Sequence, residues 1–218
     1  MRKLTILVDM DDVLNNLIER WVEELNILSG TSVAYEDITD WDITLFYPTL
    51  TTEQTYSPLQ SSEFWSSLST LPGSVETLKR LMDDGHTIRI VTASHYKDLA
   101  TKMEWLFKYY PFLGWNSVIV AHDKKLIQGD ILIDDAPHNL VGGSYNKILF
   151  SSPHNLEYDA TANDMSRVNN WAEVYATTQE LPEPLPTTLW ELYAQMPRLK
   201  RSDWLKSWNL TGLHITEF

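Results

Sequence analysis

Five short runs of apolar and β-branched residues alternate along the chain with longer segments in which apolar residues recur at helical spacing. Each run is bounded by polar or turn-forming residues, a pattern typical of strands that are buried on both faces of a sheet. The predicted strands comprise residues 4–8, 87–92, 117–121, 130–135 and 147–150. Because strands that alternate with helices build βαβ units, we expect an α/β fold with a doubly wound, parallel, Rossmann-like sheet.

The helical periodicity predicts helices over residues 14–28, 75–82, 97–109 and 168–178. One long segment interrupts the alternation, because residues 31–62 are rich in Thr, Asp, Tyr and Ser. The pair Pro72-Gly73 then marks the return to the regular pattern. We interpret residues 15–71 as a small, mostly helical cap inserted after the first strand of a core formed by residues 1–14 and 72–180.

Residues 181–218 follow as a C-terminal extension that begins with a linker, 181–186, in which every second residue is proline. Two short helices are predicted beyond this linker, and their aromatic residues include Trp190, Trp204 and Trp208. Two interpretations stay open for these side chains. They pack on the core, or they form a contact with a partner or a second subunit, as in a homodimer.

The overall composition is that of a globular, acidic protein. Hydrophobic residues make up 43% of the 218 residues and charged residues 22%, which supplies enough apolar material for a packed core. The net charge of −13 argues against binding of nucleic-acid polymers or anionic membranes, since phosphates would be repelled. The chain has no cysteine, which excludes disulfides and thiolate metal sites and fits a cytoplasmic protein. We expect neither a signal peptide nor a membrane span, because no apolar run approaches about 20 residues.

Chemically reactive side chains follow four of the predicted strands at the points where these strands end. Asp9 and Asp11 follow the first strand, Thr92-Ala93-Ser94 the second, Lys124 the third and Asp134-Asp135 the fourth. Each group has an ordinary alternative as a turn residue, a helix cap or part of a solvated loop. Because parallel strands place their carboxyl ends at one edge of a sheet, where ligands bind, the coincidence of four such groups favours an enzyme.

The residue types at this edge suit the hydrolysis of a phosphate monoester. Asp9 and Asp11 lie two apart, so in an extended backbone they would point the same way and repel each other without a cation or a proton. Carboxylate oxygens without a His or Cys cluster favour Mg²⁺ over Zn²⁺. A lysine and a hydroxyl at a strand-to-helix turn can hold phosphate oxygens, and an aspartate can attack phosphorus to form an aspartyl-phosphate.

These residues resemble the four motifs of the haloacid dehalogenase-like phosphatases, namely Asp9-Met10-Asp11-Asp12-Val13-Leu14, Thr92, Lys124 and Ile133-Asp134-Asp135. Within that superfamily the chain is similar to the 5'(3')-deoxyribonucleotidases over about residues 3–178. The similarity includes Leu71-Pro72-Gly73 ahead of a core helix, His154-Asn155 after the fifth strand and the closing Val168-Asn169-Asn170-Trp171. It implies the haloacid dehalogenase type of fold, with a helical cap over the site.

The resemblance also implies roles for individual residues. Asp9 would be the nucleophile and a ligand of Mg²⁺, while Asp11 would be the general acid and base and give its backbone carbonyl to the metal. Asp135 would complete the Mg²⁺ site, with Asp134 beside it. The residues that would hold the substrate phosphate are Thr92, Ala93, Ser94 and Lys124.

In such a protein, aromatic side chains of the cap form the pocket for the base, and the residues expected there are Trp41, Phe64 and Trp65. Two positions depart from the family pattern, since Asp12 stands where glycine is usual and Leu17 where an aromatic residue is usual. The implied activity is Mg²⁺-dependent hydrolysis of nucleoside monophosphates, 5'(3')-deoxyribonucleotides above all, to nucleoside and phosphate. Two alternatives remain at this stage: the same chemistry on another small ester such as a sugar phosphate, or a non-catalytic binding protein that kept the fold.

Overall fold

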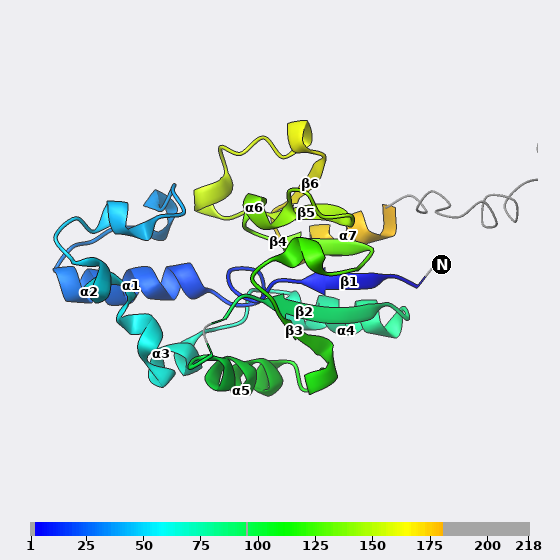
Figure 1. The fold of residues 1–218 in the computed structure, drawn as a ribbon, viewed down its shortest axis with the longest axis horizontal. Helices are drawn as coiled ribbons and strands as arrows, with labels where there is room; N and C mark the ends of the chain where they lie inside the picture. The colour runs from blue at the N-terminus through cyan, green and yellow to red at the C-terminus, as the bar shows by residue number, and fades with distance from the viewer. Residues whose placement is uncertain (1–2, 95, 181–218) are drawn as a thin grey trace, which may run out of the picture. The chain divides into compact units, whose positions relative to one another are not determined.

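The computed structural model of the chain describes residues 3–94 and 96–180 (Figure 1). The predicted extension over residues 181–218 lies outside the described residues. The core is a parallel sheet with the strand order β3-β2-β1-β4-β5-β6. Its strands are β1 (Thr5–Val8), β2 (Thr87–Thr92), β3 (Val118–Val120), β4 (Ile131–Asp134), β5 (Asn146–Phe150) and β6 (Met165–Val168).

The predicted doubly wound α/β fold is confirmed, and the structure adds β6 at the edge of the sheet. All five predicted strands are present within one or two residues of their expected bounds. Sequence reasoning misses β6 because only the two end residues, Met165 and Val168, are apolar and buried. The periodicity assigns Val168 to the following helix, which in the structure begins at Trp171.

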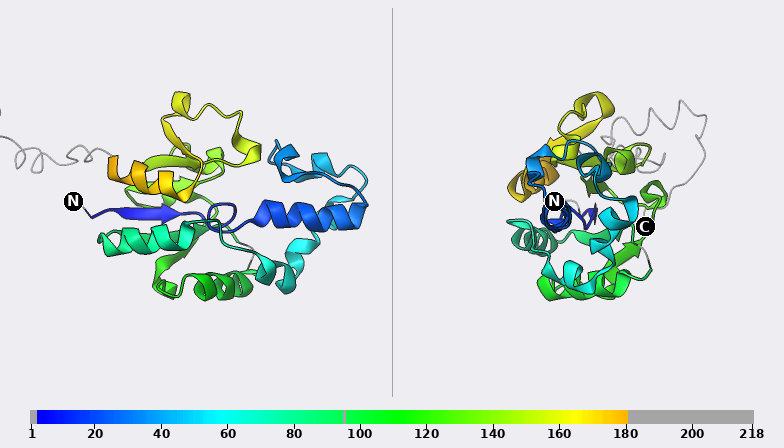
Figure 2. Two further views of the ribbon diagram at one scale, coloured as in Figure 1. Left: turned by 180° about the vertical axis from the view of Figure 1, so that it is seen from behind. Right: turned by 90° about the vertical axis from the view of Figure 1, so that its left-hand side faces the viewer.

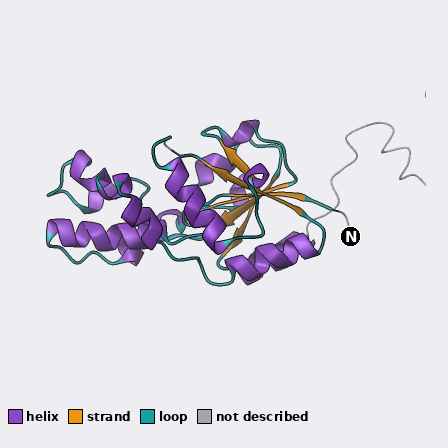
Figure 3. Cartoon of the chain, turned by 90° about the horizontal axis from the view of Figure 1, so that it is seen from below, coloured by secondary structure: helices purple, strands orange, loops and turns teal. Residues whose placement is uncertain are grey.

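Strand β1 lies at the centre of the sheet and pairs in parallel with β2 on one side and β4 on the other. The side chains of Ile6, Leu7 and Val8 are fully buried, because helices lie on both sides of the sheet (Figure 3). The order of the strands reverses at β1, with β2 and β3 on one side and β4 to β6 on the other. The carboxyl ends of β1 and β4 therefore form the topological switch point, which is where open α/β sheets bind their ligands.

The helices of the core are α4 (Ser74–Asp83), α5 (Leu99–Tyr109), α6 (Pro137–Leu140) and α7 (Trp171–Glu180). Short 3₁₀ helices connect the core elements: η4 (Trp115–Ser117), η5 (Lys124–Leu126), η6 (Pro153–Asn155) and η7 (Thr161–Asn163). Helix α6 has only four residues, which is too short for the periodicity to reveal. None of the helices within residues 3–94 and 96–180 combines the length and the hydropathy of a membrane span.

The segment over residues 15–71 extends beyond the carboxyl ends of the strands (Figures 1 and 2). It contains α1 (Leu17–Ser29), η1 (Tyr35–Asp37), η2 (Ile43–Phe46), α2 (Thr52–Tyr56), η3 (Pro58–Gln60) and α3 (Ser62–Ser67). Asn15 and Thr70 form an antiparallel bridge, so the chain leaves the core and returns to it side by side. This bridge also explains why α1 begins at Leu17, three residues later than predicted. The arrangement supports our proposal that residues 15–71 act as a cap.

Candidate active site

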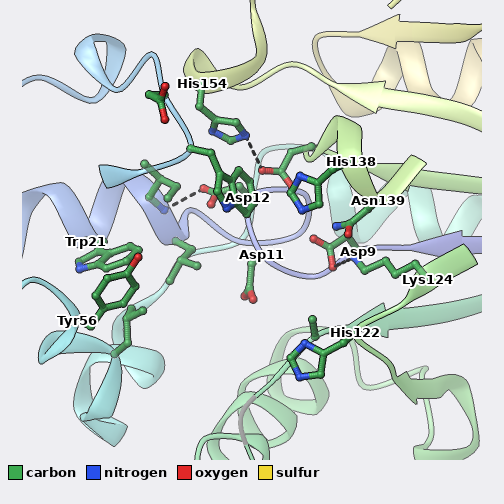
Figure 4. A pocket seen from close by; sticks show the side chains of 17 residues that line it. Asp9, Asp11, Asp12, Trp21, Tyr56, His122, Lys124, His138, Asn139 and His154 are labelled. Atoms are coloured by element: carbon green, nitrogen blue, oxygen red, sulfur yellow. Dashed lines mark hydrogen bonds and ion pairs between the residues drawn. The ribbon is translucent and has the colours of Figure 1, made fainter. Parts of the chain in front are cut away.

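The loop after β1 places Asp9 beside β4 and turns Asp11 in another direction. The backbone N–H of Asp9 donates to the Ile133 carbonyl at 2.9 Å, which extends the pairing of the two strands by one residue. A turn follows, in which the Leu14 N–H donates to the Met10 carbonyl at 2.9 Å. The expectation that Asp9 and Asp11 point the same way is wrong, because the strand ends at Val8 and the two side chains point in different directions (Figure 4). They contact different lysines, Lys124 and Lys102.

The geometry of this turn accounts for an aspartate at position 12, where glycine is usual. Its φ of 54° is left-handed, a conformation that costs a non-glycine residue about 1–2 kcal/mol. Its Oδ1 accepts a hydrogen bond from the Ile18 N–H at 2.9 Å, which satisfies an otherwise unpaired donor in the first turn of α1. A capping bond of this kind contributes about 1 kcal/mol, so it offsets much of the backbone strain and ties the cap helix to the loop.

Asp9, Asp134 and Asp135 form a buried carboxylate cluster, in which one oxygen from each lies within 4.8 Å of the others. Lys124 lies against two of them, with its Nζ 2.5 Å from Asp9 Oδ1 and 2.6 Å from Asp134 Oδ2. Asp134 ends β4, and its Oδ1 accepts from the Ala136 N–H at 2.9 Å. Lys124 opens η5, and this short helix is capped by the Asp123 side chain, which accepts from the Lys125 N–H at 3.2 Å.

The carboxyl groups of the cluster are buried close together, which disfavours their ionisation. Burial raises the pKa of Asp9 to about 7; Lys124 opposes the shift, and Asp134 and Asp11 add to it. Burial also raises the pKa of Asp134 and that of Asp135. Burial alone would lower the pKa of Lys124, but the carboxylates of Asp9 and Asp134 raise it instead. Hard oxygen ligands in this state could hold a divalent cation such as Mg²⁺.

The Asp11 carboxylate lies outside that cluster and is held on both of its oxygens. Asn15 Nδ2 donates to Oδ1 at 3.1 Å, and Lys102 Nζ lies 2.5 Å from Oδ2. Lys102 Nζ also donates to Thr92 Oγ1 at 3.2 Å and lies 4.8 Å from the ring centroid of Trp65. Sequence reasoning missed Lys102, although a signal existed: this buried lysine lies on the inward face of α5, beside Met103 and Leu106.

A cavity of about 360 Å³ opens between the carboxyl ends of the strands and the segment 15–71. Acidic residues, Ala93 and Lys124 line one part of it, and apolar and aromatic residues of the proposed cap line another (Figure 4). The complete lining is Asp9, Asp11, Asp12, Leu17, Ile18, Trp21, Asp40, Trp41, Tyr56, Leu59, Ala93, His122, Lys124, Asp135, His138, Asn139 and His154. Thr92 is buried behind this surface, and neither it nor Ser94 belongs to the lining.

The aromatic residues of the cavity differ in part from those expected. Trp41 lines it as predicted, but Phe64 and Trp65 do not, because α3 turns both rings into the interior, where each is only 5% exposed. The Trp65 indole N–H donates instead to the Leu59 carbonyl at 2.8 Å. Trp21 and Tyr56, whose ring centroids lie 5.1 Å apart, take the place assigned to those two residues. The periodicity of α1 assigns Trp21 to the core, and it gives no sign that the ring also lines the cavity.

The strand order and the segment beyond the carboxyl ends of the strands together define a fold of the haloacid dehalogenase-like class. A solved structure of a haloacid dehalogenase-like family hydrolase from Streptococcus pneumoniae has the same fold, with a TM-score of 0.56 at 13% identity. The similarity covers 81% of this chain and 99% of that one.

The sequence comparisons then identify the family. The chain belongs to the family described as 5' nucleotidase, deoxy (pyrimidine), cytosolic type C protein, whose sequence model matches residues 2–180. It is 36% identical to a 5'(3')-deoxyribonucleotidase of Bacillus subtilis over 173 residues, or 79% of this chain and 96% of that protein. It is 33% identical to a 5'(3')-deoxyribonucleotidase of Clostridium acetobutylicum over 183 residues, or 84% of this chain and 99% of that protein. The resemblance is therefore confirmed, and the chain is a phosphoric monoester hydrolase.

Proposed function

We propose that the protein hydrolyses deoxyribonucleoside monophosphates to nucleoside and phosphate in a Mg²⁺-dependent reaction. The observation that carries the proposal is the cavity, which joins a carboxylate–lysine end to an aromatic end in one continuous space. A nucleotide has the matching chemistry, with a phosphate at one end and a flat base at the other. The activity named for the Bacillus and Clostridium relatives supports the same substrate class.

In the first chemical step we assign the attack on phosphorus to Asp9. Lys124 contacts Oδ1 of Asp9, so Oδ2 is the oxygen that we assign to the attack. The new bond joins Asp9 to phosphorus, while the bond from phosphorus to the sugar oxygen breaks. Asp11, which lines the same cavity and enters this step in its protonated form, donates its proton to the departing sugar oxygen.

In the second step a water molecule hydrolyses the aspartyl-phosphate. Asp11, now ionised, accepts a proton from this water as the water attacks phosphorus, and the Asp9 carboxylate leaves. The contacts from Asn15 and Lys102 keep the Asp11 carboxylate at the cavity wall for both steps. The cycle therefore returns both aspartates to their starting states and releases inorganic phosphate.

Phosphate binding is assigned to Lys124 and to the backbone N–H of Ala93, with Ser94 behind them. Lys124 supplies a buried positive charge at the cavity surface, which favours a phosphate dianion there. Thr92 has no place in the lining, so we assign it the support of Lys102 through its 3.2 Å contact. Base binding is assigned to Trp41, Trp21 and Tyr56 in place of Phe64 and Trp65.

The carboxylate cluster is suited to Mg²⁺, because it offers hard oxygens that are buried and short of positive charge. We propose that Asp9, Asp134 and Asp135 hold the ion, together with the backbone carbonyl of Asp11. Bound Mg²⁺ would neutralise charge on the substrate phosphate and favour the ionised form of Asp9.

The absence of cysteine supports a cytoplasmic location. A homodimer remains a prediction that light scattering on the full chain would test.

The experiment that tests the proposal is a measurement of phosphate release from a panel of substrates, with Mg²⁺ and with a chelator. The panel comprises deoxyribonucleoside and ribonucleoside monophosphates, sugar phosphates and an aryl phosphate. We expect Mg²⁺-dependent release that is fastest for deoxyribonucleotides. Faster release from a sugar phosphate would overturn the substrate class while leaving Asp9 and Asp11 in their roles, and release that a chelator does not reduce would overturn the metal assignment.

A further inference from the structure

His154 is a buried histidine that the proposed reaction does not use, and it lies directly against the carboxylate cluster. Its side chain is 3% exposed, and its Nε2 is 3.1 Å from Asp135 Oδ2. This contact does not have the geometry of a linear hydrogen bond. On the other side of the ring, Nδ1 lies 3.1 Å from Ser152 Oγ. With the proton on Nε2, the protonated nitrogen faces the Asp135 carboxylate, and Nδ1 can accept from the serine hydroxyl.

The backbone around His154 is fixed to the same aspartate. The neighbouring Asn155 is buried, and its Nδ2 donates to the backbone carbonyl of Asp135 at 2.7 Å and to that of Phe150 at 2.8 Å. Arg167 of β6 holds Asn155 in turn, since its Nη1 donates to Asn155 Oδ1 at 2.8 Å. The short helix η6 is therefore anchored to the core, and the position of the His154 ring is set by a rigid support.

The proposed cap contacts this same histidine at two points. The indole of Trp41 meets the His154 ring edge to face, with ring centroids 5.0 Å apart, and it meets His138 in the same way at 5.1 Å. The hydroxyl of Tyr35, in η1, lies 3.3 Å from Ser152 Oγ. A continuous series of contacts thus runs from Tyr35 through Ser152 and His154 to Asp135.

We propose that His154 is a positioning residue that orients Asp135 for cation binding and couples the binding of the cation to the closure of the cap. This proposal rests on the assignment of Asp135 as a Mg²⁺ ligand. Residues that contact a metal ligand from behind fix its orientation, and their loss weakens metal binding about 10- to 100-fold in characterised sites. Because Trp41 and Tyr35 also contact this unit, binding of the ion and closure of the cap favour each other, and the coupling must be reciprocal.

The first test is calorimetric titration of the full chain with Mg²⁺ alone, without substrate. We expect His154→Ala to raise the dissociation constant for Mg²⁺ about 10- to 100-fold, and His154→Gln to recover part of the loss, because its amide can donate near the position of Nε2. The matched control is His122→Ala, which removes another histidine of the cavity lining and is expected to leave the dissociation constant unchanged. Thermal unfolding in chelator would show that the variants fold equally well without metal.

The second test examines the cap end of the series. Tyr35→Phe removes only the hydroxyl that meets Ser152, and we expect it to weaken Mg²⁺ binding about two- to five-fold. Tyr47→Phe is the matched control, because that hydroxyl bonds within the cap, to the Val22 carbonyl at 3.2 Å. In hydrogen exchange of the wild-type protein, Mg²⁺ is expected to slow exchange over residues 35–41, and His154→Ala is expected to abolish this protection.

The outcomes separate this proposal from the proposed function. Mg²⁺ binding that is equal in the wild-type protein and His154→Ala would overturn the positioning role, while the phosphatase assignment stands on its own substrate panel. Mg²⁺ that binds with normal affinity but leaves exchange over residues 35–41 unchanged would overturn the coupling to the cap. A wild-type chain that releases phosphate from deoxyribonucleotides and binds no Mg²⁺ would overturn the proposal through the metal assignment on which it rests.

Discussion

Two aspartate–lysine pairs stand close together in the site, and they differ in what surrounds them. Asp9 pairs with Lys124, and Asp11 pairs with Lys102, at the same distance of 2.5 Å. Both lysines are 2% exposed. Lys124 lines the cavity and also contacts Asp134, whereas Lys102 lies behind the lining, between Thr92 and Trp65.

This difference determines which of the two lysines can contact a substrate. Lys124 lines the cavity, so in the proposed reaction its charge would act on both Asp9 and the substrate phosphate. Lys102 does not line the cavity, so it can act on the reaction only through Asp11 or Thr92. The two aspartate–lysine pairs have the same contact distance but different surroundings. Substitutions of Lys124 and Lys102 are therefore expected to change different kinetic constants.

The largest expected effect belongs to the first pair. Asp9→Asn keeps the shape of the side chain but removes the nucleophilic oxygen, so we expect kcat to fall by about 10⁴-fold or more. The amide removes a buried charge, and the melting temperature should not fall. Steady-state phosphate release and thermal unfolding in chelator measure the two quantities, and activity near that of the wild type would exclude Asp9 as the nucleophile.

The comparison between the lysines is tested by Lys124→Met against Lys102→Met. We expect Lys124→Met to lower kcat about 10²- to 10³-fold and also to raise KM, because a charge that faces the phosphate is lost. Lys102→Met should lower kcat about 10- to 100-fold with KM unchanged, because Asp11 loses one of its two supports. Lys102→Arg should recover part of the kcat that Lys102→Met loses. Asp11→Asn removes the acid completely, so its kcat is the lower limit for any substitution that acts through Asp11. A rise in KM for Lys102→Met as large as that for Lys124→Met would contradict the distinction.

A further prediction concerns stability and pH without bound metal. The pKa of Asp9 is about 7 in the folded protein, against 3.8 for a free aspartate carboxyl, so folding favours the protonated form. Between about pH 4 and pH 7 this carboxyl ionises in the unfolded chain but stays protonated in the folded protein. The free energy of unfolding therefore falls as the pH rises through this range. Urea unfolding in chelator across this range should show the decline, and Mg²⁺ should counteract it. Asp9→Asn should make the decline less steep without abolishing it, because the pKa values of Asp134 and Asp135 are also raised. A stability that rises over the same range in chelator would contradict the assignment.

The smallest expected effect belongs to Asp12, which stands next to Asp11 along the chain. Asp12→Gly relieves the left-handed backbone but loses the bond from the Ile18 N–H to Asp12 Oδ1. These two changes oppose each other, so the free energy of unfolding should change by no more than about 1 kcal/mol. Turnover should stay within a few-fold of the wild type, and a large gain in activity would show that the third carboxylate hinders the site.

Sequence patterns singled out both residues of the first pair but only Asp11 of the second, for a physical reason. Asp9, Lys124 and Asp135 follow strands, and the carboxyl ends of parallel strands meet at one edge whatever the details of packing. Lys102 lies within α5, where no rule of topology relates it to Asp11. Only its place on an apolar helix face marked it, and a single polar residue on such a face has several explanations.

The cap was predicted less well than the sheet edge, again for a physical reason. Helix α3 has six residues, so periodicity cannot decide which side of it faces the cavity. Helix α3 packs against α5, with the rings of Phe64 and Trp65 turned inward, and the hydrogen bond to the Leu59 carbonyl also holds Trp65. The side chains that face the cavity, Trp21 and Tyr56, come from two other helices, and their meeting depends on how the cap folds back on itself.

The measurement that tests the central claim most directly is the capture of the covalent intermediate. The wild-type protein is quenched in acid during turnover of a deoxyribonucleoside monophosphate with Mg²⁺, then digested and examined by mass spectrometry. The account predicts one phosphoryl group on the peptide that contains Asp9, and none on the same peptide of Asp9→Asn. A phosphoryl group on another residue, or an unmodified Asp9 peptide at every time point while turnover proceeds, would contradict it.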